Sequence, residues 1–296
     1  MYDVIIVGMG ISGITAAIYA KRSNMKVLLL DKAMPGGLLN SIEEIGNYPG
    51  LPNISGPDFA QALLAQIQDL KIEYKLDEVV EFVLNEDVKK VVTKKETYES
   101  KYVILALGRK PKYLGLDNEK DYLGRGLSTC AVCDAFAYKN APIAVVGTGN
   151  SALQESLYLS KVVSKIYLLN RRDGFRGEDF LVEKVKNDPK IEIKYNVNVK
   201  KINESEDGKI SSVTLDNNET LEVKGVFIYV GYRPDTDLLK EYPILDEEGY
   251  IDVNDAFESQ VSGVFAIGDV IRKEVYQLVT AASDGAIVIN GINKRK

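Results

Sequence analysis

A glycine-rich segment between an apolar run and a helix-like run is the strongest constraint on the fold of this 296-residue chain. The segment Gly8-Met9-Gly10-Ile11-Ser12-Gly13 follows the apolar run Val4 to Val7 and precedes a helix predicted over Ile14 to Ser23. Glycines there allow a tight turn and let the backbone approach a pyrophosphate at the helix N-terminus. A second apolar run ends in Asp31, an acid at the spacing expected for binding a ribose hydroxyl. The segment predicts a dinucleotide-binding unit.

The same pattern returns in the middle of the chain. The strand-like run Pro142 to Val146 leads into Gly147-Thr148-Gly149-Asn150-Ser151-Ala152, and a helix is expected to about Lys161. The next strand, Ile166 to Leu169, ends in Asn170-Arg171-Arg172, with Arg176 a few residues on. Arginines bind phosphate bidentately, so this strand end favours a 2′-phosphate and NADPH over NADH. The chain therefore predicts an α/β fold with two Rossmann-like dinucleotide-binding domains.

The length fits two domains at about 150 residues each. Residues 1 to about 110 form the first predicted unit and residues 111 to 237 the second. The C-terminal stretch has a buried-strand pattern from Val264 that ends in Gly268-Asp269, and a helix is expected over Ala281 to Ile292. A helix after such a strand end fits a lid over a cofactor.

Cys130 and Cys133 are the only cysteines, and they form a C-x-x-C pair. A chain of this length buries an ample core without disulfides, so the pair indicates metal binding or redox chemistry. A structural zinc site needs four ligands, and the chain has no second cysteine pair and no histidine. The sequence therefore predicts a redox-active dithiol and no metal site. Cysteines at a helix start have lowered thiol pKa values, which favours the reactive thiolate.

Charge and hydropathy exclude several classes of function. The net charge of -6 argues against a nucleic-acid surface, which needs clustered lysine and arginine. No run of about 18 apolar residues occurs, so no transmembrane helix is expected. The segment Met1 to Val7 has no basic region or cleavage site and enters a strand directly, which predicts a cytoplasmic protein.

Several further motifs resemble the low-molecular-weight thioredoxin reductases of the flavoprotein disulfide reductase superfamily, and the resemblance runs nearly end to end. They are the first glycine segment, Pro35-Gly36-Gly37, Asn47-Tyr48-Pro49-Gly50, Gly124-Arg125-Gly126, Cys130-x-x-Cys133-Asp134, Gly147-x-Gly149-x-x-Ala152, residues 171–176 and residues 263–269.

The resemblance implies a discontinuous FAD domain of residues 1–110 and 238–296 and an inserted NADPH domain of residues 111–237. It implies a homodimer in which NADPH reduces FAD, FAD reduces the cysteine pair, and the pair reduces thioredoxin. Cys133 is expected to contact the flavin, Cys130 to attack thioredoxin and Asp134 to donate the proton. Because the pair lies just before the second glycine segment, it shares a domain with the nicotinamide, and the two must use one flavin in turn. The family achieves this by rotating the small domain, which makes residues 109–113 and 232–238 the expected hinges.

The resemblance also implies the cofactor-binding residues. Those for FAD are Gly8, Gly10, Ile11, Ser12, Gly13, Asp31, Lys32, Gly37, Leu38, Asn47, Val79, Ala106, Gly108, Gly268, Asp269, Gln277 and Leu278. Those for NADPH are Gly149, Asn150, Ser151, Arg171, Arg172, Arg176 and Gly231.

The chain departs from the family pattern at several positions. The family has Pro-Ala at Ile11-Ser12, Glu at Asp31, Gln at Leu38, Thr at Leu107, His at Asn170 and Arg at Tyr276. Several of these positions touch the flavin in the family, so flavin reactivity and donor choice depend on them.

Three other functions share this fold. A dithiol oxidase that passes electrons to oxygen needs no arginines at the second site, and a reductase fed by ferredoxin needs no second glycine segment. A non-catalytic flavin-binding sensor would need a partner-docking segment, and the sequence offers none. The related ferredoxin-NADP reductases lack the cysteine pair. Of these functions, the sequence favours NADPH-dependent reduction of thioredoxin.

Overall fold

The computed structural model describes residues 1–51 and 53–295, which form two compact units. The first unit contains residues 1–110 and 233–296, and the second contains residues 111–232. Residues 233–237, which the sequence analysis assigned to the second unit, belong to the first because their contacts lie there. The chain passes between the units twice, where β7 (Arg109–Pro111) pairs with β16 (Tyr232–Pro234).

A seven-stranded sheet forms the centre of the first unit, in the order β3-β2-β1-β6-β5-β4, with β17 also paired to β6. Its strands are β1 (Tyr2–Val7), β2 (Val27–Asp31), β3 (Glu73–Leu76), β4 (Val79–Val83), β5 (Lys89–Thr93), β6 (Thr97–Leu105) and β17 (Val264–Ala266). β1, β2, β3, β6 and β17 pair in parallel, whereas β4 and β5 form an antiparallel hairpin with the start of β6.

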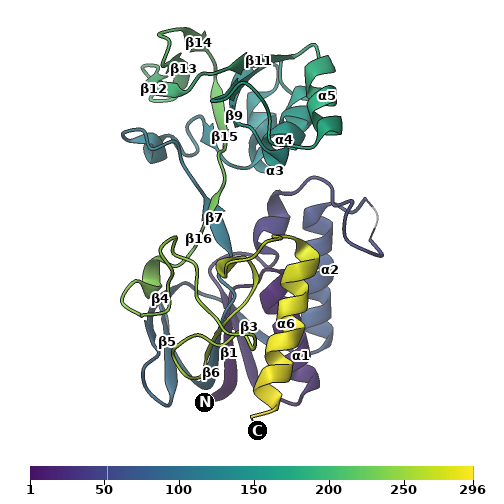
Figure 1. The fold of residues 1–296 in the computed structure, drawn as a ribbon, viewed down its shortest axis with the longest axis vertical. Helices are drawn as coiled ribbons and strands as arrows, with labels where there is room; N and C mark the ends of the chain where they lie inside the picture. The colour runs from purple at the N-terminus through teal and green to yellow at the C-terminus, as the bar shows by residue number, and fades with distance from the viewer. Residues whose placement is uncertain (52, 296) are drawn as a thin grey trace. The chain divides into compact units, whose positions relative to one another are not determined.

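Three helices cover one face of this sheet: α1 (Ile11–Arg22), α2 (Gly56–Asp69) and α6 (Leu278–Asn293), with α1 and α6 side by side (Figure 1). β1 is buried on both faces, as parallel strands inside α/β proteins are. Val4 and Ile6 pack toward the helices, and Ile5 and Val7 pack against the opposite core, which includes Leu239.

The second unit is built around a five-stranded parallel sheet in the order β11-β10-β9-β15-β8. Its strands are β8 (Leu127–Ser128), β9 (Pro142–Gly147), β10 (Lys165–Asn170), β11 (Ile191–Tyr195) and β15 (Gly225–Tyr229). One core lies between the sheet and helices α3 (Ala131–Asp134), α4 (Asn150–Ser160) and α5 (Asp179–Asn187), and the other lies against β12 (Val199–Glu204), β13 (Ile210–Leu215) and β14 (Thr220–Glu222).

Each unit thus repeats the strand, glycine turn and helix that the sequence predicted, and the predicted α/β class with Rossmann-like sheets is confirmed. The helix at the cysteine pair has a single α turn and continues as a 3-10 turn over Ala135–Tyr138, so any dipole effect on the thiols is small. No helix of the described residues is long and apolar enough to cross a membrane.

The contact between α1 and α6 generates the first prediction. A Cβ added to Gly285 on α6 would lie 2.5 Å from the carbonyl oxygen of Ser12 and 2.8 Å from the backbone nitrogen of Ala16. We expect Gly285→Ala to lower the free energy of unfolding by about 1–3 kcal/mol, because the helices must separate. Urea unfolding followed by circular dichroism measures this change.

Gly291, also on α6, is the matched control. Its added Cβ would be 3.8 Å from the carbonyl oxygen of Ala256, an ordinary contact distance. Gly291→Ala should therefore raise the free energy of unfolding by about 0.5–1 kcal/mol, the usual gain for alanine inside a helix. Equal effects of the two substitutions would contradict the role given to Gly285.

Candidate active site

In the first glycine loop, residues 8–13, two glycines are packed against backbone and one borders open space. A Cβ on Gly8 would lie 2.1 Å from the carbonyl oxygen of Ala106, and one on Gly13 would lie 1.9 Å from the carbonyl oxygen of Gly8. The backbone itself fills those spaces. A Cβ on Gly10 would meet nothing within 4 Å, and Gly10 is the N-cap of α1, where no side chain of a described residue bonds the first-turn N–H groups. The first-turn N–H groups of α1 thus border open space where a phosphate fits.

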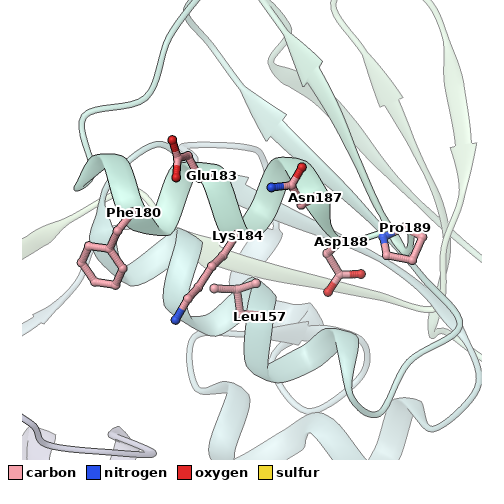
Figure 2. A pocket seen from close by; sticks show the side chains of 7 residues that line it. All are labelled: Leu157, Phe180, Glu183, Lys184, Asn187, Asp188 and Pro189. Carbon is pink, nitrogen blue, oxygen red and sulfur yellow. The ribbon is translucent and has the colours of Figure 1, made fainter.

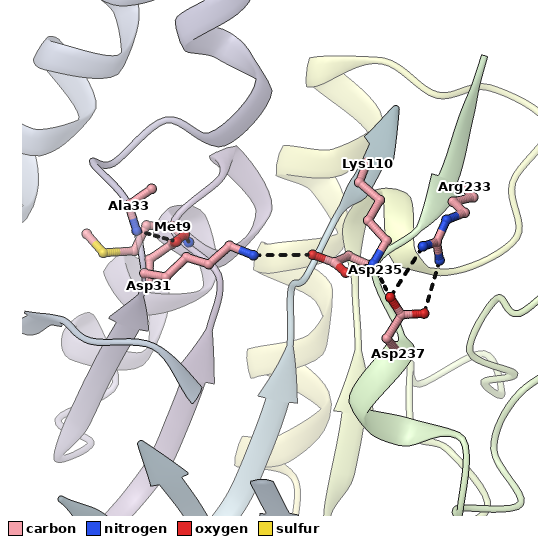
Figure 3. A network of polar contacts seen from close by, with 8 residues as sticks. Met9, Asp31, Ala33, Lys110, Arg233, Asp235 and Asp237 are labelled. Carbon is pink, nitrogen blue, oxygen red and sulfur yellow. Dashed lines mark hydrogen bonds and ion pairs between the residues drawn. The ribbon is translucent and has the colours of Figure 1, made fainter. Parts of the chain in front are cut away.

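Asp31 holds the same loop from the end of β2. Its Oδ2 accepts a hydrogen bond from the Met9 backbone N–H at 2.7 Å, and its Oδ1 accepts one from Ala33 at 3.0 Å (Figure 3). Each carboxylate oxygen has a further lone pair. A ribose hydroxyl can therefore donate to Asp31 without breaking either bond.

Other expected FAD residues come together around this loop. A Cβ on Gly37 would lie 3.4 Å from the Cα of Gly10, and one on Gly268 would lie 2.5 Å from Ser12 Oγ. Asn47 Nδ2 donates to Gln277 Oε1 at 3.1 Å, which joins two expected flavin-side residues that are far apart in the sequence. A hollow of about 450 Å³ is lined by residues 46–50, including Asn47.

The remaining expected FAD residues are less closely grouped. Asp269 forms an ion pair with Arg109 at 2.9 Å, and the Arg109 guanidinium stacks 3.9 Å from the ring centroid of Tyr276. Lys32 forms an ion pair with Asp235, with 3.8 Å between Nζ and Oδ2. The others lie on strands, turns or the helix around the sheet: Leu38 is 37% exposed, Val79 starts β4, Ala106 follows β6, Gly108 precedes β7, and Leu278 starts α6.

One buried ion pair at this site was missed by the sequence analysis. Asp284 on α6 accepts the backbone N–H of Gly268 at 2.8 Å and pairs with Lys273, and both side chains are nearly buried. The pair fixes the Gly-Asp turn after β17. The sequence held one signal for this pair: Asp284 lies among apolar residues of the predicted helix, and a charge buried there needs a partner of opposite charge.

The second glycine loop also contains one closely packed glycine and one that borders open space. A Cβ on Gly147 would lie 2.6 Å from the Cβ of Ala152, whereas one on Gly149 would meet nothing within 4 Å. Gly149 starts α4 without a side-chain cap, and Gly231 has a φ of 106° beside open space. The backbone around Gly149 therefore fits a second dinucleotide.

A loop bearing three arginines lies against this second glycine loop. We call residues 171–176 the arginine loop. Its Arg176 N–H donates to the carbonyl of Thr148 at 2.7 Å, and Asn150 and Glu178 exchange two hydrogen bonds of 2.7 and 2.9 Å. Arg171, Arg172 and Arg176 are exposed, and none of them forms an ion pair with a described residue. Three guanidinium groups without an ion pair to a described residue, on a loop bonded to the second glycine loop, favour a ligand with an additional phosphate.

Cys130 and Cys133 form a disulfide, and their Cα atoms are 5.4 Å apart. Cys133 is exposed and Cys130 is partly buried. The backbone N–H of Cys133 donates to Cys130 Sγ at 3.2 Å. After reduction, this donor would stabilise negative charge on Cys130, the charge that a nucleophilic sulfur carries.

Asp134 follows the pair and is held by Ser128. Ser128 Oγ donates to Asp134 Oδ2 at 2.6 Å and accepts the backbone N–H of Cys130 at 3.0 Å. Ser128 was not among the expected site residues, and its position at the end of the short strand β8 gave no signal in the sequence. Two sulfurs, a carboxylate and a hydroxyl thus lie within residues 128–134.

Several enzyme families combine two dinucleotide-binding sites with a redox disulfide. Similarity to known proteins shows to which of these families the chain belongs. Residues 2–286 match the family model described as pyridine nucleotide-disulphide oxidoreductase. The sequence is 37% identical to the thioredoxin reductase of Bacillus subtilis over 99% of this chain and 94% of that protein.

The chain belongs to the thioredoxin reductase family. A crystal structure of Lactococcus lactis thioredoxin reductase matches this family member with a TM-score of 0.93 and 35% identity, over 99% of this chain and 98% of that one. A ferredoxin-flavin thioredoxin reductase from Clostridium acetobutylicum is more distant, with a TM-score of 0.55 and 28% identity over 99% and 98% of the two chains. The predicted family and the predicted oxidoreductase class are confirmed.

A surface hollow of this thioredoxin reductase family member lies apart from the expected site residues. It measures about 610 Å³ and lies between α4 and α5, with Leu157, Phe180 and Lys184 at its edge (Figure 2). No residue that lines it belongs to either glycine loop or to the cysteine pair.

The two chain crossings are anchored on the side of the first unit by a charged network. Lys110 of β7 pairs with Asp235 at 2.6 Å and also with Asp237, and Arg233 of β16 pairs with Asp237 at 3.1 Å (Figure 3). Hydrogen bonds from Arg233, and to a lesser extent from Lys110, hold the pKa of the Asp237 carboxyl below its usual range.

This network generates a pH-dependent prediction. A lowered pKa stabilises the fold above the unfolded value of about 3.9, and that stability is lost as the pH falls through the folded value. Because Asp237 is 44% exposed, solvent screens the pair, and Asp237→Asn should cost about 0.5–1 kcal/mol at pH 7. Urea unfolding at pH 7 and pH 3 measures the difference, which should be smaller at pH 3.

Asp255→Asn is the matched control, because Asp255 is an exposed aspartate of the same unit that forms no ion pair with a described residue. It should change stability little at either pH. A cost for Asp237→Asn that is equal at the two pH values would contradict the ion-pair explanation.

Proposed function

We propose that this protein is an NADPH-dependent thioredoxin reductase that uses FAD and the Cys130–Cys133 disulfide. The observation that carries the proposal is the combination on the second unit of a redox disulfide with a glycine loop and three unneutralised arginines. A disulfide alone would fit many reductases, whereas the arginines specify the electron donor.

The cofactors are assigned to the two glycine loops. When bound, NADPH and FAD would supply the electron pair that reduces the disulfide. Residues 1–110 and 233–296 would bind FAD, with Gly10 at the pyrophosphate and Asp31 at the ribose. Residues 111–232 would bind NADPH, with Gly149 at the pyrophosphate and the arginine loop at the 2′-phosphate.

The cysteine pair carries the thiol exchange. In the reduced protein, the Cys130 thiolate attacks one sulfur of the thioredoxin disulfide, forming a mixed disulfide and releasing the other sulfur as a thiolate. Asp134, next to the pair, is proposed as the acid that protonates this leaving thiolate. The Cys133 thiolate then attacks Cys130 Sγ, which restores the internal disulfide and releases thioredoxin with two thiols. Two electrons leave the pair, and both enter thioredoxin.

Thioredoxin is proposed as the substrate because the Bacillus subtilis and Lactococcus lactis relatives are both named thioredoxin reductases. A homodimer and a cytoplasmic location are proposed on family resemblance. We also propose that the paired strands β7 and β16 let the units reorient, since the nicotinamide and the disulfide share one unit and one flavin.

Ferredoxin is the alternative electron donor, because the Clostridium acetobutylicum structure is described as a ferredoxin-flavin thioredoxin reductase. A dithiol oxidase is the alternative reaction. The three exposed arginines of the arginine loop favour NADPH over both, since neither alternative needs a site for a 2′-phosphate.

An anaerobic titration tests the donor. We expect NADPH to bleach the absorbance of the bound flavin at a lower concentration than NADH, because only NADPH carries the phosphate that the arginine loop would bind. Oxidised thioredoxin added afterwards should restore the flavin absorbance. A flavin that is reduced only by reduced ferredoxin, or that keeps its electrons in the presence of thioredoxin, would disprove the proposed function.

Serine substitutions test the cysteine pair. Cys130→Ser and Cys133→Ser should each reduce thioredoxin turnover to background, because a serine hydroxyl cannot complete the exchange. Reduction of the flavin by NADPH should persist in both variants, which serves as the internal control. Thioredoxin turnover that survives either substitution would show that the pair is incidental.

A further inference from the structure

The side chain of Asn170 is an amide at the end of β10, immediately before the first arginine of the arginine loop, and it is completely buried. A buried amide costs free energy unless its donor and acceptor are both paired. Asn170 Nδ2 donates to the carbonyl of Gly174 at 3.0 Å, and its Oδ1 accepts the backbone N–H of Arg172 at 2.9 Å. Both bonds of this side chain go to the arginine loop and close that loop on itself.

Backbone bonds attach the closed loop at three places. The carbonyl of Asn170 accepts the N–H of Val197 at 3.1 Å, the carbonyl of Arg172 accepts that of Asn196 at 3.2 Å, and Arg176 donates to Thr148. The loop therefore spans from the end of β11 to the second glycine loop. The Asn170 amide lies inside this frame and fixes the backbone from which the arginines extend.

The arginine side chains have no such support. They are exposed, and the structure gives them no ion pair or side-chain hydrogen bond with a described residue. Their placement therefore depends on the backbone of the loop. A bidentate guanidinium–phosphate contact requires the donors to be in place before binding, because ordering them afterwards costs affinity.

We propose that Asn170 is a positioning residue that sets the preference of this protein for a dinucleotide with a 2′-phosphate. The proposal rests on the proposed use of NADPH. Asn170 does not contact the nucleotide; it holds the arginine loop in the conformation that presents its guanidinium groups. The family residue at this position, histidine, also offers one donor and one acceptor in its neutral form.

Two small ligands isolate the effect of the 2′-phosphate. Adenosine 2′,5′-bisphosphate and adenosine 5′-monophosphate differ only in that group, and isothermal titration calorimetry at fixed salt concentration gives the dissociation constant of each with the flavin-loaded protein. We expect Asn170→Leu to weaken the bisphosphate at least about tenfold and to leave the monophosphate unchanged, because leucine has a similar size but pairs neither Gly174 nor Arg172.

Asn203→Leu is the matched control. Asn203 lies in the same unit, and its Nδ2 bonds to Ser212 at 3.1 Å and Thr214 at 2.9 Å on β13, outside the arginine loop. The same substitution there should leave both dissociation constants unchanged. In turnover assays, Asn170→Leu should raise the KM for NADPH with little change in kcat, and Asn170→His should recover part of the lost affinity.

The outcomes separate this inference from the proposed function. If the unaltered protein binds both ligands equally, the proposed donor is wrong, and the role of Asn170 is wrong with it. If the unaltered protein prefers the bisphosphate and folded Asn170→Leu keeps that preference, or loses both ligands equally, only the role of Asn170 is overturned. Should Asn170→Leu fail to fold, Asn170→Ala leaves room for a water and is judged by the same two constants.

Discussion

Backbone packs directly against backbone where the parallel strands end, and both sites depend on that packing. At Gly8 and Gly13 the loop and the start of α1 approach so closely that no side chain fits, and Gly147 repeats this constraint beside Ala152. Each loop therefore presents the remaining glycine, Gly10 or Gly149, to open space at the start of a helix. The close backbone packing that fixes each turn therefore also leaves the N–H groups at the helix start accessible to a phosphate.

The sequence predicted what local pattern encodes. Strands, glycine turns and helices at both loops follow from apolar periodicity and glycine spacing, and the structure contains them nearly at the expected residues. The partners of buried polar groups were not predictable in this way. Lys273 and Asp284, or the Asn170 amide and the Gly174 carbonyl, become partners only when a turn or a helix has been placed, and nothing in the sequence marks them as partners.

The boundary between the units illustrates the same limit. The sequence analysis placed residues 233–237 in the second unit, within the expected hinge at residues 232–238. In the structure these residues belong to the first unit, where Lys110 pairs with Asp235 and Asp237 and Arg233 pairs with Asp237. These contacts anchor both chain crossings in the first unit.

The proposed thiol exchange and the proposed electron supply depend on different parts of the structure. All the groups proposed for exchange lie within residues 128–134: the two sulfurs, the Asp134 carboxylate and the Ser128 hydroxyl that holds it. Their mutual geometry belongs to one short segment and is independent of the orientation of the units. The proposed electron supply, by contrast, uses groups that would be bound by both units. The chain has no histidine, and Asp134, the proposed acid, lies in the same short segment as the cysteines.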